Sequence, residues 1–82
     1  MAVDVLNEDT LVVAVATPAS ALLLLDRQGR VLKVLAHEGT RVGEVTALED
    51  VVVEHDPGPS GTTRARLLVL DQDGTRVQVF SP

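Results

Sequence analysis

The chain has 82 residues, a formal net charge of −5, no cysteine and a single aromatic residue, Phe80. This length predicts one domain, near the size at which a single hydrophobic core is only just sufficient. The lack of cysteine excludes a disulfide framework and a thiolate zinc site, and the acidic charge disfavours nucleic acid or an anionic membrane as partner. Valine, leucine and alanine must fill the core, and they bury less area than aromatic side chains, so we expect help from self-association.

The N-terminal residues predict a protein without a secretion signal. Three acidic residues occupy the place of a basic signal segment, and the first cation is Arg27. The longest mostly apolar stretch, residues 11–25, is interrupted by polar residues and a proline, and it is too short to span a bilayer. We therefore expect a cytoplasmic protein with no membrane partner.

The first half of the chain predicts four strands. Residues 3–6 alternate weakly, and a polar turn at residues 7–10 follows. Residues 11–16 (LVVAVA) are apolar at every position, which favours a strand that is covered on both faces. The proline within residues 17–20 ends this strand, since proline cannot continue a central ladder. Residues 22–35 then predict a hairpin.

This hairpin, LLLLDRQGRVLKVL at residues 22–35, is repeated as LLVLDQDGTRVQVF at residues 67–80, with six of 14 aligned positions identical. In both copies an apolar run leads into an Asp-x-x-Gly turn. Asp favours the first position of a type I turn, and Gly adopts the left-handed conformation that closes a three-residue loop with a bulge. The return strand of the second copy alternates, with Val77 and Val79 on one face.

The second half predicts four strands as well. A polar connector at residues 37–41 leads into a weaker strand at residues 42–48 (VGEVTAL), and residues 51–55 form the next strand before the second hairpin. Both halves can be read as four-stranded meanders. We therefore predict one domain, residues 1–82, with two possible pseudo-repeats at 1–36 and 42–82.

The fold class follows from these patterns. No window of helical length shows an apolar stripe of period 3.6 with capping residues at its ends. We predict an all-β fold of about eight short antiparallel strands in two similar four-stranded meanders, arranged as a sandwich or small barrel.

The two meanders, about 40 to 45 residues apart and each with a hairpin of the LLVLDxDGT-V-V- type, resemble blades of β-propellers of the NHL or PQQ-like kind. The resemblance covers nearly the whole chain as two blades and is most specific at residues 22–35 and 67–80. The near absence of aromatic residues departs from the family. Because a propeller needs at least four blades, the resemblance implies assembly with further copies or a longer chain. A pair of propeller-like blades is the alternative to the sandwich.

Residues 56–63 (DPGPSGTT) form the clearest loop, with two prolines and two glycines in eight residues. Such a loop is typical of a flap, a binding loop or a long surface connection. The candidate interaction loop consists of Pro57, Gly58, Pro59, Ser60 and Gly61.

Metal binding has four candidate ligands in the sequence. Glu54, His55 and Asp56 are adjacent, and His37 could meet them in space; two histidines and a carboxylate suit a metal ion. On a strand, however, Glu54 and Asp56 point to one face and His55 to the other. We favour solvated polar residues at strand ends over a metal site.

The sequence contains no nucleophile elbow, no phosphate-binding glycine loop and no dinucleotide-binding motif. We therefore expect no enzymatic activity and no cofactor. The pattern favours a non-enzymatic structural or protein-interaction module that self-associates, with another protein as a further candidate partner. The alternative is a small-ligand or metal-binding β-domain that uses residues 56–63.

Overall fold

A computed structural model describes residues 1–57 and 63–82. These residues form seven strands: β1 (Ala2–Asn7), β2 (Thr10–Val15), β3 (Ala21–Asp26), β4 (Val31–His37), β5 (Asp50–Pro57), β6 (Thr63–Asp71) and β7 (Arg76–Phe80).

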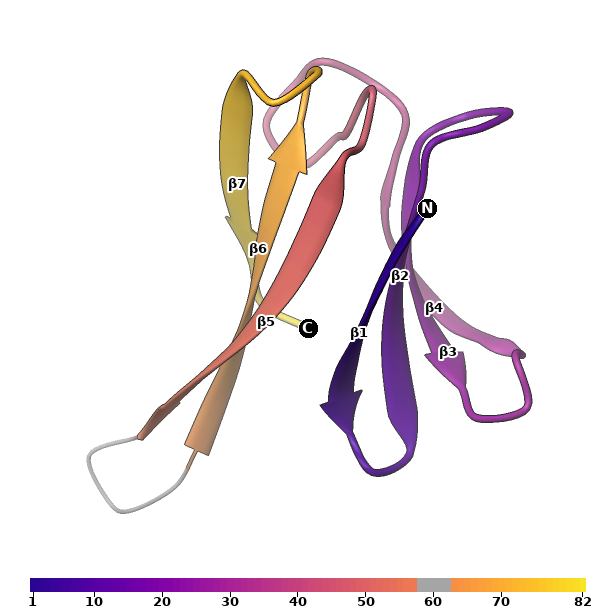
Figure 1. Ribbon diagram of the computed structural model, residues 1–82, viewed down its shortest axis with the longest axis vertical. Helices are drawn as coiled ribbons and strands as arrows, with labels where there is room; N and C mark the ends of the chain where they lie inside the picture. The colour runs from indigo at the N-terminus through magenta and orange to yellow at the C-terminus, as the bar shows by residue number, and fades with distance from the viewer. Residues whose placement is uncertain (58–62) are drawn as a thin grey trace.

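The strands make two antiparallel meanders, β1-β2-β3-β4 and β5-β6-β7, which face each other as two layers (Figure 1). The predicted all-β antiparallel class is confirmed. The two sheets remain separate, so the sandwich is correct and the small barrel is wrong. Across the described residues there is no helix, and hence none long and apolar enough to cross a membrane.

One predicted strand is not formed. Residues 42–48 belong to an irregular connector between β4 and β5 and contribute one isolated bridge, at Val45. The positive φ angles of Gly43 (87°) and Ala47 (47°) interrupt the extended conformation that a strand requires. Val45 and Leu48 are buried instead between the two sheets. The second meander therefore has three strands in the described part of the chain, where the sequence pattern predicts four.

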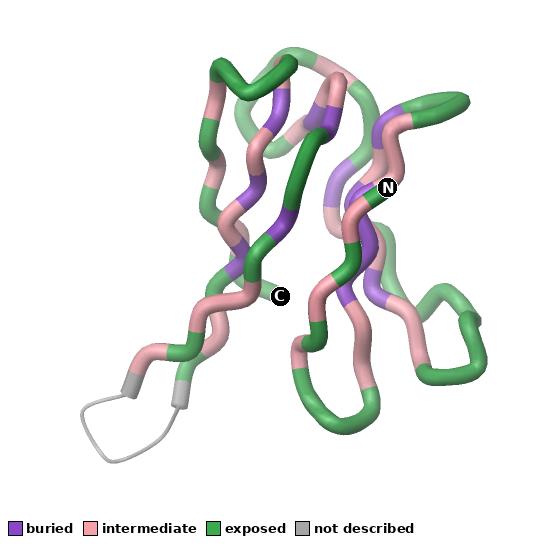
Figure 2. Tube along the Cα trace, in the orientation of Figure 1, coloured by how far each residue is buried: buried purple, intermediate pink, exposed green. Residues whose placement is uncertain are grey.

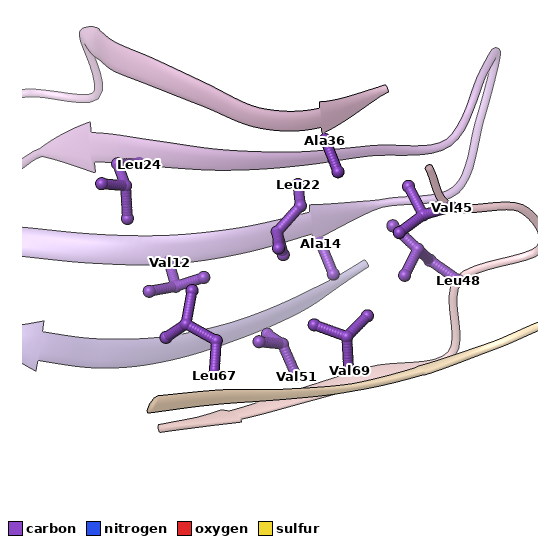
Figure 3. Close-up of a cluster of buried hydrophobic side chains, with 10 residues drawn as sticks. All are labelled: Val12, Ala14, Leu22, Leu24, Ala36, Val45, Leu48, Val51, Leu67 and Val69. Atoms are coloured by element: carbon purple, nitrogen blue, oxygen red, sulfur yellow. The ribbon is translucent and has the colours of Figure 1, made fainter. Parts of the chain in front are cut away.

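The core lies between the two sheets and consists of small aliphatic side chains. Figure 3 shows Val12, Ala14 and Leu22 of the first sheet pointing toward Leu67 and its neighbours on the second. The complete buried cluster is Val12, Ala14, Leu22, Leu24, Ala36, Val45, Leu48, Val51, Leu67 and Val69. The only aromatic residue, Phe80, packs at its margin, so the core has the small-residue composition that the sequence predicts.

A buried ion pair holds the connector against the second sheet. The carboxylate of Asp71 has no exposed surface and accepts hydrogen bonds from Arg76 Nη2 at 2.6 Å and Nε at 3.0 Å. The same carboxylate accepts from the amide of Thr46 at 3.3 Å. Arg76 also donates to the carbonyl oxygens of Thr40 and Glu44, at 2.9 Å each. The pair thus links both ends of the connector to the start of β7.

The two Asp-x-x-Gly turns have different conformations. In the turn after Asp26 only Gly29 has a positive φ, which agrees with the predicted type I turn and bulge. In the turn after Asp71, Gln72 and Asp73 also have positive φ, so the predicted type I form is wrong there. The amide of Gln72 donates to a carbonyl of the connector, at 2.6 Å, and this contact selects the second conformation.

The repeated hairpins also occupy different places. The first is β3–β4, the third and fourth strands of its sheet, and the second is β6–β7, the second and third strands of the other sheet. Their turns lie at opposite ends of the sandwich (Figure 1). By position in the sheets, β1 corresponds to β5 and β2 to β6.

The stability of the fold is expected to decrease in acid because of Asp71. The hydrogen-bonded guanidinium of Arg76 lowers the pKa of Asp71 below its usual value, although burial opposes the shift. A carboxyl group with a lowered pKa contributes stability that is complete above its unfolded pKa of about 3.9 and is lost as the pH falls through the folded pKa. We expect the urea concentration at the unfolding midpoint to decrease when the pH is lowered below about 4.

The Asp71→Asn variant isolates this contribution. It is expected to be less stable at neutral pH and to lose less additional stability between about pH 4 and pH 2 than the wild type, because the titrating group is gone. Asp26→Asn is the matched control, since Asp26 holds the same turn position and its pKa is also lowered, mainly by the backbone amide of Arg30. Parallel curves for Asp71→Asn and the wild type would contradict the assignment.

Candidate interaction surface

The outer face of the four-stranded sheet is apolar across all four strands. Residues opposite one another on antiparallel strands share a face, so the positions between the core residues point away from the core. Val3, Val13, Leu23 and Val34 form one row across the sheet. We call this surface the A face, and it consists of Val3, Val5, Leu11, Val13, Val15, Ala21, Leu23, Leu25 and Val34. None of these side chains is polar or charged.

Exposure on the A face is greatest at the edge strands. Val34 on β4 is 52% exposed, whereas Val13, between Val3 and Leu23 in the row, is 5% exposed. Along β1 the exposed residues alternate with partly buried ones (Figure 2). The exposed ones are Val3, Val5 and Asn7. Asp4 points inward, where its carboxylate accepts a hydrogen bond from the amide of Val53 at 2.8 Å. β1 therefore exposes two valines and turns one acidic side chain inward, beside Ala2 and Leu6, which pack against the core.

The outer face of the three-stranded sheet carries a second apolar surface. Two rows cross it, Val52–Leu68–Val79 and Asp50–Leu70–Val77, and we call their apolar residues the B face: Val52, Leu68, Leu70, Val77 and Val79. The exposed carboxylate of Asp50 lies at its margin, on the edge strand β5. The valines of β7 are exposed, Val79 by 60%, while Arg76 and Gln78 of the same strand turn inward to the connector. The predicted grouping of Val77 and Val79 is correct, and the structure places both on the solvent side.

The far end of the same outer face is charged. Arg66 on β6 pairs with both Glu54 and Asp56 on β5, at 2.7 Å from Arg66 Nη2 to Asp56 Oδ2. Hydrogen bonding to Glu54 raises the pKa of Arg66, so the arginine stays charged. Two of the candidate metal ligands are thus engaged by a cation on the B-face side of the sheet.

His55 points to the other side, as the alternation predicts. It lines a cavity of about 430 Å³ between the sheets, together with Leu6, Leu24, Leu32, Ala65 and residues of the β1–β2 turn. His37 lies at the opposite end of the sandwich, because it pairs with Ala21 at the start of β3, on the rim of the A face. The structure therefore does not bring the two histidines together. Within residues 1–57 and 63–82 no cluster of three or more His, Asp or Glu side chains could hold a metal ion.

The candidate interaction loop cannot be placed in the same way. Pro57 ends β5, and Gly58, Pro59, Ser60 and Gly61 lie outside the described residues.

Comparison with protein-family models, with curated proteins and with solved structures found no match. The interpretation of the two faces therefore depends on their own geometry and chemistry. Sequence reasoning did not identify either face, although one signal for the A face was present. Residues 11–16 and 22–25 are apolar at every position, which indicates strands covered on both faces.

Proposed function

We propose that this protein is a non-enzymatic structural or interaction module that associates with copies of itself through the outer faces of its sheets. The observation that carries the proposal is the A face, on which nine apolar positions spread over four adjacent strands without a charge. The face exposes Val3, Val5 and Val34 at its two edges, and exposed apolar surface of this kind marks interaction sites.

The two edge strands support the same function. Asp4 on β1 and Arg76 and Gln78 on β7 form specific contacts inside the molecule, and the valines of both strands are exposed to water. Burying this valine surface in a contact between copies would return about 25 cal/mol for each Å² removed from water. A core of small residues in a chain of this length gives only a small free energy of unfolding, so burial of further apolar surface between copies would be a large addition to it.

Other parts of the molecule support a role without catalysis. The two histidines lie at opposite ends of the sandwich, and the acidic groups nearest to His55 on its strand pair with Arg66. The successive meanders stacked face to face support the resemblance to propeller blades. An acidic, cysteine-free chain supports a cytoplasmic location.

The test is the mass in solution, measured by light scattering over a wide concentration range. We expect the wild type to exceed its chain mass of 8.7 kDa and to dissociate on dilution. Val34→Glu places a carboxylate on the A face, and we expect it to weaken association at least tenfold, because the charge must be desolvated in the contact.

Leu32→Glu is the matched control. Leu32 lies on the same strand with a similar exposure of 56%, but it lines the cavity between the sheets. This variant is expected to associate as the wild type does. A wild-type protein that stays at 8.7 kDa at millimolar concentration would overturn the proposal.

A further inference from the structure

We infer that the copies associate head to tail, with the A face of one copy against the B face of the next, and that the assembly closes into a ring. This inference rests on the proposed self-association and specifies its geometry. Four observations carry it: the presence of two apolar faces, their location on opposite sides, the wedge shape of the sandwich and the size of each face.

The two faces suit each other chemically. The A face carries no charge, so a partner surface with unpaired charges would have to desolvate them there. The B face offers an apolar surface of the same valine and leucine composition, and the one carboxylate in its rows, Asp50, lies at the edge of the sheet on β5. The inner faces of these two sheets already pack against each other through valine, leucine and alanine side chains (Figure 3).

The positions of the faces distinguish head-to-tail contact from a symmetric pair. The A and B faces are the outward surfaces of two different layers, on opposite sides of the sandwich (Figure 1). A symmetric pair joined through two A faces would leave Val77 and Val79 in water. Repeated A-to-B contact covers both faces of every copy, and such heterologous contacts generate rings when the rotation closes.

The sandwich is a wedge, which favours closure. At one edge β1 and β5 lie side by side, joined by the hydrogen bond from the Val53 amide to Asp4. At the other edge the connector lies between the sheets. The amide of Val45 donates to the carbonyl of His37 on β4 at 3.1 Å, and the carbonyl of Glu44 accepts from Arg76 on β7 at 2.9 Å. When wedge-shaped copies stack face to face in the same orientation, each copy is rotated relative to the one before it about the narrow edge, and the stack curves toward a ring.

The size of the faces supports closure as well. Four strands about 4.8 Å apart and six residues long, at about 3.3 Å per residue, cover a face of roughly 19 by 20 Å, or about 400 Å². A stable interface buries about 800 Å² on each partner. One A-to-B contact buries at most about half of this area on each copy. In a ring each copy forms two such contacts, one through each face, so the total area buried on each copy is about twice that of a single contact.

Two variants with one damaged face each test the inference. Val34→Glu damages the A face and Val79→Glu the B face, and the two valines are similarly exposed, at 52% and 60%. Head-to-tail association predicts that each variant alone loses the wild-type mass. It also predicts that an equimolar mixture at millimolar concentration forms a weak complex containing one copy of each, because the intact A face of one variant meets the intact B face of the other through a single contact. Native mass spectrometry with one variant isotope-labelled identifies this complex.

The outcomes separate the inference from the proposed function. Wild-type mass retained by Val79→Glu but lost by Val34→Glu would show A-to-A contact, which overturns the inference and leaves self-association intact. A mixture that contains only single chains at millimolar concentration, or a wild-type mass that grows with concentration without a plateau, would also overturn the inference. A monomeric wild type would overturn the proposed function itself. Circular dichroism checks that both variants fold, and Val34→Thr with Val79→Thr replaces the pair if either does not.

Discussion

Replacing Arg76 with alanine is expected to lower the free energy of unfolding by about 3–5 kcal/mol, because it leaves the buried carboxylate of Asp71 without its cation. The substitution also removes the two donors that hold the carbonyls of Thr40 and Glu44 in the connector. A domain of this length has about 4–12 kcal/mol in total, so the variant should be close to unfolding. Urea denaturation followed by circular dichroism measures the loss.

The matched control is Arg30→Ala in the other Asp-x-x-Gly hairpin. Arg30 Nε lies 2.6 Å from Asp26 Oδ2, a distance similar to that in the buried pair, but the Arg30 side chain is 76% exposed. Its removal should cost about 0–1 kcal/mol, since exposed ion pairs contribute little. Both variants are best measured in the Val34→Glu background, so that association does not contribute to the apparent stability. Equal losses for Arg76→Ala and Arg30→Ala would show that burial of the Asp71 pair has no energetic effect.

Leu67→Ala is expected to cost about 2–5 kcal/mol, the range for a leucine truncated in a packed core. Leu67 on β6 is fully buried and faces the first sheet near Val12 and Leu22 (Figure 3). The buried neighbours of Leu67 are short aliphatic side chains held on strands, and its aromatic cross-strand partner Phe80 packs at the margin of the core, so most of the cavity should remain.

Leu32→Ala removes the same atoms from a leucine that is 56% exposed, and we expect it to cost less than about 1 kcal/mol. Chemical denaturation of both variants under one set of conditions gives the comparison. A loss of under 1 kcal/mol for Leu67→Ala would mean that the two sheets do not depend on this contact.

Local patterns in the chain predicted much of the secondary structure. The β-branched and leucine runs at residues 11–16 and 22–25 are strands, and the turn after Asp26 has the predicted glycine-closed form. The two-residue period correctly separated His55 from Glu54 and Asp56, because successive side chains on any strand point to opposite faces. These features depend only on residues close together in sequence.

Contacts between distant residues overrode the local patterns elsewhere. The VGEVTAL segment at residues 42–48 has the composition of a strand, yet it becomes a connector because Asp71, Arg76 and Gln78 bond to its backbone. Backbone hydrogen bonds from the amides of Gln72 and Asp73 to carbonyls of the connector accompany the left-handed conformation of these two residues. No pattern within seven residues of the chain could report these bonds, whose partners lie about 25 to 35 residues away.

The sequence by itself determined that this protein is all-β and where most of its strands and turns lie, because β-propensity, two-residue alternation and turn chemistry act over a few residues. Only the tertiary structure decided which face of each strand is inside. Alternation places Val77 and Val79 on one face of β7 and Arg76 and Gln78 on the other, but it does not say which face is buried. That choice depends on which other part of the chain packs against the strand. In this molecule the connector packs against the polar face of β7, and Val77 and Val79 are left on the exposed outer face.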